Sequence, residues 1–257
     1  MMLIMKHFFG PEDASTACGM FTAAHIISLV ICLALVAVCV ALSLKLSDGG
    51  IKRITVIIAV FVIVTEIIKI IYKISYSYVY PLDLILPISY CSLFIYSTWM
   101  CAYGKGLVYR AGASFITGGC IVGGLAFLIV PATSLMMHPI YHYLSIHSML
   151  FHSSMVYLGI IYLYRGIVRL DMRSFKVYSV YVLITCAVAI ILNVSTGSNL
   201  MLLTFPVNIP IAIIDQLASS FPYLYTLCAI AVYLFMPYLV AALIQKIIKG
   251  RNACENI

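Results

Sequence analysis

The sequence predicts an all-α, polytopic integral membrane protein: a seven-transmembrane helix bundle with the N-terminus outside and the C-terminus in the cytoplasm. Three observations predict it: the composition, a series of apolar segments of spanning length, and the distribution of basic residues between the connections. Of the 257 residues, 64% are hydrophobic and only 9% are charged. Because a soluble domain carries roughly 25% charged residues, this surface suits lipid, whose core requires helices that satisfy their own backbone hydrogen bonds.

Seven apolar segments approach the length of about 20 residues that a transmembrane helix needs. In chain order they are Thr22–Leu44, Ile54–Ile71, Leu84–Ala102, Ala111–Val130, Tyr143–Tyr164, Val177–Leu192 and Phe221–Leu243. The predicted parts of the chain are an outer N-terminal segment (1–21), a seven-helix transmembrane domain (22–243) and a cytoplasmic basic tail (244–257). Pro206 and Pro210 interrupt any straight span between Leu200 and Ala218, where there is room for a half-helix.

Basic residues are concentrated on one side of the predicted bundle. The first, third and fifth connections and the tail together hold 12 of the 15 lysines and arginines, and the other side has only Lys6, Lys69 and Lys73. Cytoplasmic loops carry such an excess of basic residues, so this side is predicted to be cytoplasmic. The short loops are typical of a bacterial protein, which places the chain in the plasma membrane.

The same residues argue against several classes of function. The net charge of +7 comes from helix ends, which does not indicate nucleic acid binding. The nine cysteines form no CxxC pair. Of the four histidines between His138 and His152, only His138 and His142 have the i, i+4 spacing of a metal site, with Pro139 between them. We predict no metal and no cofactor; the predicted partners are membrane lipids, and the oligomeric state is not predicted.

Ionisable residues inside spans are candidates for function because lipid makes them costly. Glu66 and Lys69 lie three residues apart in the second span, and His147 and His152 lie in the fifth. The simpler alternative for Glu66 and Lys69 is a local pair whose charges neutralise each other.

Cys91 and His152 lie at similar depths below the outer surface. At 1.5 Å per residue, Cys91 is roughly 10 Å into the third span and His152 roughly 13 Å into the fifth. A thiol and an imidazole in one layer could act as nucleophile and base, since the thiolate is the reactive form. The alternative is that Cys91 only fills space between helices.

A polar connection follows the sixth span and includes Asn193, Gly197, Ser198 and Asn199. Its donors suit the binding of a lipid head group or the stabilisation of an oxyanion. The alternative is an ordinary helix-capping loop with Gly197 in the left-handed conformation.

These elements, in this order, resemble the YwaF-type bacterial membrane proteins and the related transmembrane protein 164. The family's Pro-Leu-His-Leu-Cys motif is similar to the segment from Leu86 to Cys91, and its fifth-span histidine corresponds to His152. Its Gly-Thr/Ser-Asn-Tyr-Met loop, preceded by an Asn, resembles the loop that runs from Asn193 to Met201. Its second-span acidic residue and last-span proline correspond to the following two residues: Glu66 and Pro222. Ser89 replaces a family histidine, and His147 stands where a glutamine is expected.

The resemblance implies a membrane acyltransferase that moves fatty acyl chains between phospholipids and lysophospholipids. Cys91 would carry the acyl chain as a thioester, His152 would act as base, and Glu66 would orient the imidazole. Asn193, Gly197, Ser198 and Asn199 would bind substrate. If water took the place of the acceptor lipid, the same chemistry would make the protein a lipase. The alternatives are a small-molecule or lipid transporter with its polar site in the outer half of the bundle, and a receptor or sensor with seven spans.

Overall fold

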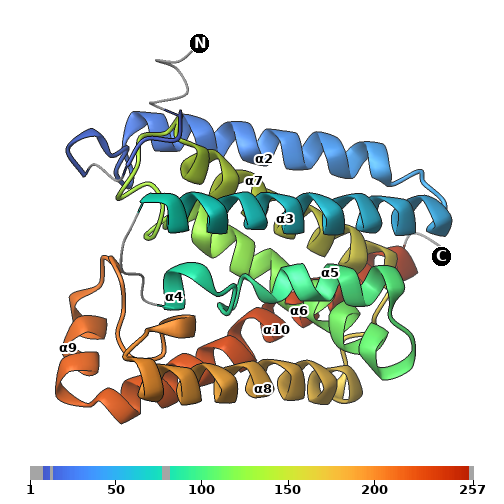
Figure 1. The fold of residues 1–257 in the computed structure, drawn as a ribbon. Coiled ribbons are helices and arrows are strands. Elements are labelled where there is room, and N and C mark those ends of the chain that lie inside the picture. Colours follow the sequence, from blue (N-terminus) through green and yellow to red (C-terminus); the bar gives the residue numbers. More distant parts are fainter. Residues whose placement is uncertain (1–7, 12–13, 77–81, 255–257) are drawn as a thin grey trace.

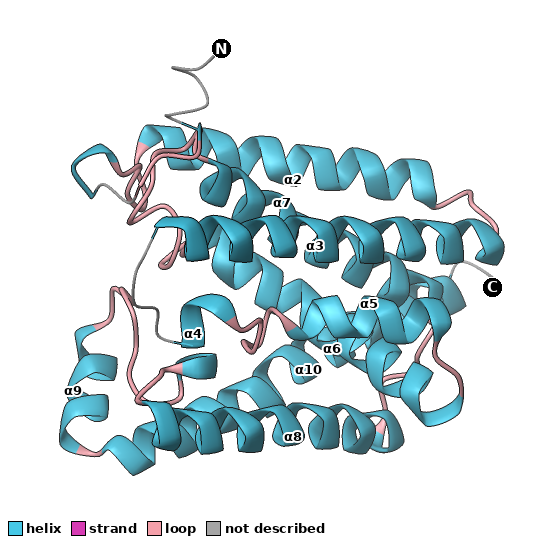
Figure 2. Cartoon of the chain, in the orientation of Figure 1, coloured by secondary structure: helices cyan, strands magenta, loops and turns pink. Residues whose placement is uncertain are grey.

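The computed structural model describes residues 8–11, 14–76 and 82–254, and the regular structure in these ranges is helical throughout (Figure 2). The long helices are α2 (Ala23–Ser43), α3 (Asp48–Tyr76), α6 (Gly106–Ile129), α7 (Tyr143–Arg165), α8 (Met172–Thr196) and α10 (Pro222–Cys254). The short ones are η1 (Ala14–Thr16), α4 (Leu82–Ile85), α5 (Leu93–Tyr103), η2 (Leu200–Leu202) and α9 (Ala212–Ser220). Within the described ranges, six helices are long and apolar enough to cross a membrane.

Six of the seven predicted spans therefore coincide with long helices, and the structure shows a polytopic membrane protein. The prediction of a continuous third span over Leu84–Ala102 is wrong. α4 has four residues, α5 has 11, and the backbone from Leu86 to Ser92 between them is not a regular helix. Pro87 accounts for the interruption, because a proline disfavours the helical conformation of the residue before it.

The other predicted boundaries differ from the structure in smaller ways. The segment from Leu200 to Ala218, which has room for a half-helix, contains most of α9, which begins after Pro206 and Pro210 and ends at Ser220. The last helix continues to Cys254, past the predicted start of the tail at residue 244. Of the predicted outer segment, residues 1–7 and 12–13 lie outside the described ranges, as do residues 255–257 of the tail.

The centre of the bundle is α6, which crosses behind α5 and lies between the layer of α2, α3 and α7 and the layer of α8 and α10 (Figure 1). In its most apolar stretch 72% of the residues are buried, compared with 17% in α2. Glycines allow this close approach: a Cβ on Gly124 would lie 2.7 Å from Val156 Cγ2 of α7. Small residues serve the same purpose wherever membrane helices pack closely.

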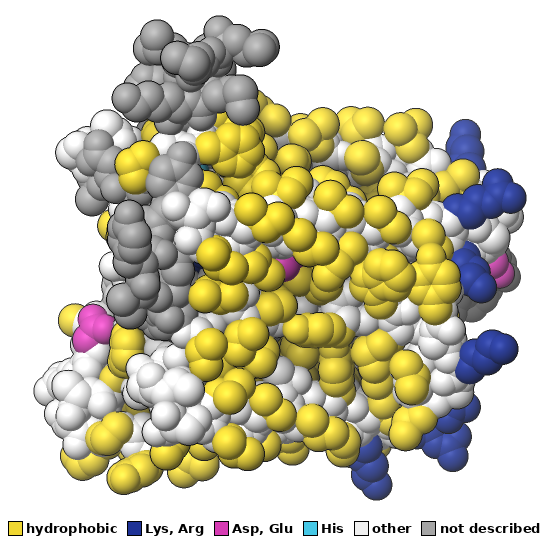
Figure 3. Space-filling model, in the orientation of Figure 1, with side chains coloured by type: hydrophobic (Ala, Val, Ile, Leu, Met, Phe, Trp, Pro, Cys, Tyr) yellow, Lys and Arg dark blue, Asp and Glu magenta, His cyan; other side chains and the backbone are white. Residues whose placement is uncertain are grey.

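The two ends of the bundle differ in charge. Lysine and arginine side chains gather at one end in Figure 3, and the lateral surface between the ends is mostly hydrophobic. At the basic end, Arg165 of α7 donates hydrogen bonds to the carbonyl oxygens of Leu44 and Leu46, which follow α2. At the opposite end, the segment before α2 is tied to the α6–α7 connection by a hydrogen bond of 2.8 Å from Gly19 N to Leu135 O.

Candidate functional site

Cys91 lies in the break between α4 and α5, close to the first turn of α5. Its carbonyl accepts a hydrogen bond of 3.0 Å from Phe94 N, and its side chain packs, partly exposed, against the main hydrophobic core. Ser92 N donates to the hydroxyl of Ser89 at 3.0 Å, so the residue in place of the family histidine shapes the turn.

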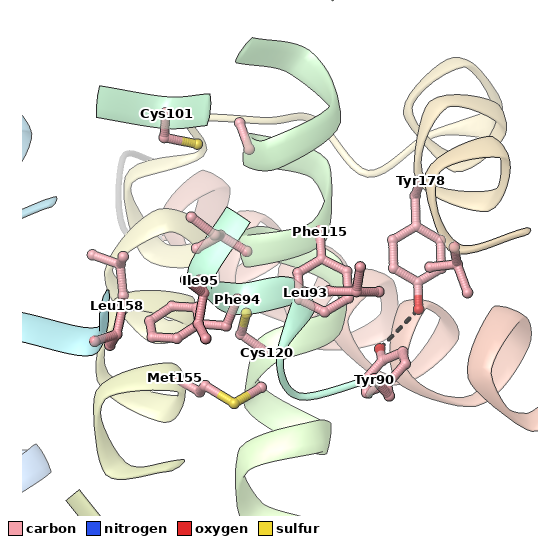
Figure 4. Packing of buried hydrophobic residues seen from close by; sticks show 14 of the residues in the cluster. Tyr90, Leu93, Phe94, Ile95, Cys101, Phe115, Cys120, Met155, Leu158 and Tyr178 are labelled. Atoms are coloured by element: carbon pink, nitrogen blue, oxygen red, sulfur yellow. Dashed lines mark hydrogen bonds between the residues drawn. The ribbon is translucent and has the colours of Figure 1, made fainter. Parts of the chain in front are cut away.

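Tyr90 fixes the break against three other helices. Its hydroxyl lies 2.9 Å from the hydroxyl of Tyr178 in α8 (Figure 4), and its ring stacks on Tyr233 of α10 at 5.1 Å. Gly119 and Gly123 of α6 leave room for the Tyr90 ring, since a Cβ on either glycine would lie 2.7 or 2.8 Å from Tyr90. The residue directly before Cys91 is therefore held on several sides.

The break also contacts a backbone turn after α8. Met201 N donates to Ile88 O at 3.3 Å. Met201 and Leu202 have φ values of 57° and 52°, in the left-handed region that bulky residues rarely adopt. Each such residue costs on the order of 1–3 kcal/mol and persists only where its surroundings enforce it, often at functional sites. Here Tyr233 donates to Met201 O at 2.6 Å, and Tyr225 donates to Leu202 O at 2.8 Å.

The predicted substrate-binding residues build this turn. The Asn193 side chain accepts from Leu200 N at 2.7 Å and donates to Leu200 O at 3.1 Å. The carbonyl oxygen of the Asn199 side chain accepts from Thr204 N at 3.0 Å. Gly197 ends α8 in the left-handed conformation with a φ of 71°, as the capping alternative predicted. Both amides thus bond within their own loop, and a role in head-group or oxyanion binding stays a prediction.

Ser198 joins this loop to α4. Its hydroxyl accepts a hydrogen bond of 3.2 Å from Leu82 N. The loop that follows α8 therefore contacts α4 through Ser198 and the break itself through Met201.

His152 has the hydrogen bonding of a proton acceptor. Its Nδ1 lies 2.7 Å from Ser148 O, and because a carbonyl only accepts, Nδ1 carries the proton and Nε2 keeps a lone pair. Nε2 is buried and has no hydrogen-bond partner among the described residues. The ring stacks on Phe127 of α6 at 3.6 Å. In the described part of the chain no hydrogen bond joins His152 to Cys91, so their shared role stays a prediction.

Glu66 faces a different histidine from the predicted one. Its Oε1 lies 2.5 Å from Lys69 Nζ, and its Oε2 lies 3.8 Å from Nε2 of His147. The local pair with Lys69 matches the simpler alternative. The described hydrogen bond of His152 goes to Ser148 O, and a catalytic role of Glu66 stays a prediction. Sequence reasoning missed that His147 lies near Glu66, because the rotation of α7 against α3 leaves no signal in the sequence.

His138 and His142 form a stacked pair outside the spanning helices. The rings of His138 and His142 lie 4.1 Å apart, and His142 Nε2 is 3.1 Å from Gly10 O. Burial, aided by the charges of His142 and Lys73, lowers the pKa of His138 to about 4, so this imidazole is neutral at pH 7. Within the described ranges, no three His, Cys, Asp or Glu residues gather as a metal site would require.

Long apolar helices around a glycine-rich central helix, with a thiol in the broken segment beside it, define a polytopic α-helical membrane protein with a candidate site inside the bundle. The model of the TMEM164 family matches residues 20–240, which is most of the chain. The chain belongs to the TMEM164 family, as the sequence motifs indicated. Neither the curated proteins nor the solved structures show a significant match.

Proposed function

We propose that this protein is a membrane-embedded acyltransferase that moves fatty acyl chains between phospholipids and lysophospholipids through a thioester on Cys91. The single observation that carries the proposal is the position of Cys91 in a non-helical break inside the bundle, beside the first turn of α5. Membership of the TMEM164 family and the free lone pair on His152 support it.

The reaction has two steps. Nε2 of His152 accepts the thiol proton, and the Cys91 sulfur attacks the ester carbonyl of a phospholipid. The bond from carbon to the ester oxygen breaks, and the departing lysolipid takes the proton from His152. A lysolipid hydroxyl then gives its proton to His152 and attacks the thioester, which releases the thiolate. Water in place of that hydroxyl would release a fatty acid, and the protein would be a lipase.

Stabilisation of the oxyanion is assigned to the loop that follows α8. A site of this kind needs donors held in place before the reaction starts. The strained turn at Met201 and Leu202 is fixed by hydroxyls from α10 and contacts the break through Ile88. Because the amides of Asn193 and Asn199 bond within the loop, their part in the reaction is to hold its backbone in place.

The topology belongs to the same proposal. Counting α4, the break and α5 as one interrupted crossing gives seven crossings, with the N-terminus outside. The basic end of the bundle in Figure 3 then lies in the cytoplasm, following the positive-inside rule. With this orientation α4 and the loop that follows α8 lie on the outer side. The same proposal makes the chain a YwaF-type member of the family in a bacterial plasma membrane.

An acyl-enzyme trap tests the mechanism. Wild type, Cys91→Ala, His152→Ala and Cys228→Ala are incubated with a phospholipid of defined acyl chains, and intact masses are recorded before and after hydroxylamine. Cys228 is the matched control because it is an exposed cysteine of α10. We expect a hydroxylamine-labile acyl adduct on wild type and Cys228→Ala and none on Cys91→Ala. An adduct that persists on Cys91→Ala would overturn the proposal, as would unchanged lipids and no adduct in any variant.

A transporter is the second candidate, and the interrupted crossing of α4 and α5 is the observation that favours it. Transporters often place their sites at discontinuous helices near the middle of the membrane. The ion pair of Glu66 and Lys69 inside α3 would be part of such a site. Substitution of Cys91 by serine separates the two candidates, because it abolishes acyl transfer and leaves transport in place.

A further inference from the structure

A charged pair lies inside α3 although a span disfavours charge. The Glu66 side chain is 3% exposed and the Lys69 side chain is 23% exposed. Glu66 Oε1 forms an ion pair with Lys69 Nζ at 2.5 Å, and an ammonium has three N–H donors. Lys69 is thus held in place by a buried carboxylate and keeps donors for a second acceptor at the edge of the bundle.

His147 of α7 is a second polar group at the same place. Its side chain is 5% exposed, and its Nε2 lies 3.8 Å from Glu66 Oε2, which is too long for a hydrogen bond. Neither of its ring nitrogens has a hydrogen-bond partner among the described residues. Buried polar atoms are nearly always satisfied by protein, water or ligand, so this imidazole points to a polar partner from outside the chain.

The depth of Lys69 identifies the kind of partner. Lys69 follows Ile54, where the second span was predicted to begin, by 15 residues, or roughly 22 Å along a helix. The hydrocarbon core is about 30 Å thick, and a lysine near the end of a span extends its stem toward the head groups. Lys73 adds a second positive charge one turn further on. In the proposed topology these charges lie just beneath the phosphates of the outer leaflet.

We propose that Lys69 and His147 bind the phosphate of a glycerophospholipid from the outer leaflet, with Glu66 holding the ammonium in position. Lysine is a compact point charge that suits phosphate, and a neutral imidazole adds one N–H donor. Glu66 repels the same anion, so binding is of moderate strength and weakens with salt.

The orientation of the bound lipid deepens the proposed function and rests on it. In a glycerophospholipid the ester groups lie on the membrane side of the phosphate. A phosphate held at Lys69 therefore directs the esters deeper into the bundle. α3 packs against α4 and α5, the two helices that flank Cys91, and Tyr96 of α5 donates to Pro87 O of the break at 3.1 Å. Lys69 thus selects phospholipid over uncharged glycerides for the thiol.

Binding is measured in a Cys91→Ala background, where acyl transfer cannot occur. The probes are dioctanoylphosphatidic acid, dioctanoylglycerol with the same chains, and inorganic phosphate, each titrated by calorimetry into the protein in detergent. We expect the phosphatidic acid to bind about tenfold more tightly than dioctanoylglycerol, as for a charge-assisted hydrogen bond. We expect Lys69→Gln to bind the two lipids with equal affinity and Lys69→Arg to keep most of the preference for phosphatidic acid. Lys176→Gln, at the basic end of the bundle, should keep the full preference.

A double variant without either charge distinguishes a loss of binding from a loss of folding. Lys69→Gln alone leaves Glu66 buried without its cation, whereas Glu66→Gln with Lys69→Gln removes both charges and is expected to fold and to lose the preference for phosphate. Equal binding of the two lipids, or a preference that survives the double variant, would overturn the proposal and leave Glu66 and Lys69 as a self-neutralising pair. Inorganic phosphate that binds as tightly as phosphatidic acid would assign the site to the free ion. The acyl-enzyme trap on wild type decides the proposed function separately.

Discussion

Tyr233→Phe removes a single hydroxyl that holds the strained turn beside Cys91. That hydroxyl donates to Met201 O at 2.6 Å, and the phenyl ring that remains can still stack on Tyr90. Met201 is 2% exposed, so its carbonyl loses a donor where water does not easily replace it. A buried acceptor without a partner costs about 1–3 kcal/mol. Relaxing Met201 and Leu202 from positive φ recovers a similar amount, which favours a rearranged turn.

The expected result is a slow enzyme that still folds. A barrier higher by about 1.4 kcal/mol lowers a rate roughly tenfold, so Cys91 should acquire its acyl chain about ten times more slowly in Tyr233→Phe. The assay is the time course of the adduct by intact mass, with thermal unfolding in detergent measured alongside. Tyr223→Phe is the control because Tyr223 lies on the same helix and is 87% exposed. A wild-type rate of acylation in Tyr233→Phe, or an equally reduced rate in Tyr223→Phe, would refute the reasoning.

Three further substitutions test the scaffold. Gly124→Ala places a Cβ 2.7 Å from Val156 Cγ2 and should lower the free energy of unfolding by about 1–3 kcal/mol in thermal unfolding, whereas Gly49→Ala, with no contact closer than 3.8 Å, should not. Asn193→Ala removes two hydrogen bonds from the loop and should speed its cleavage by protease; an unchanged rate would contradict the geometry. The backbone N–H of Ser174 donates a hydrogen bond to the Asp171 carboxylate and holds its pKa below the usual value. Its stabilisation is therefore present above the unfolded pKa and lost as pH falls through the folded one, so Asp171→Asn should unfold with a flatter acid dependence between neutral pH and about pH 3.

The sequence predicted those features that depend on many neighbouring residues of the same type. Six spans could be predicted because each is a long apolar run, and the basic end because lysines and arginines cluster in alternate connections. The break escaped prediction although Pro87 is visible, because its apolar neighbours Leu86 and Ile88 extend the hydrophobic run across it. The left-handed turn at Met201 left no trace, since bulky residues adopt it only when tertiary contacts enforce it.

In the candidate site, too, the sequence indicates the reactive residues but not the contacts around them. Cys91 and His152 stand out in the sequence as a thiol and an imidazole inside apolar segments. Their surroundings do not, because the contacts come from other helices: Tyr233 of α10 holds the turn beside the break, and Phe127 of α6 stacks on His152. The proximity of Glu66 and His147 depends on how α3 and α7 are rotated against each other, which the hydrophobic pattern of a mostly apolar helix does not fix.

The polarity of α7 has a consequence for how the protein is made. The mean hydropathy of α7 is 1.4, the lowest of the six long helices, compared with 3.0 for α2. A segment with two histidines and four serines gains little by leaving the translocation channel for lipid alone. α6 is synthesised immediately before it and already offers the glycine surface against which α7 rests. We therefore expect the two helices to enter the bilayer as a hairpin, so that the residues that make the site polar also make the insertion of α7 depend on α6.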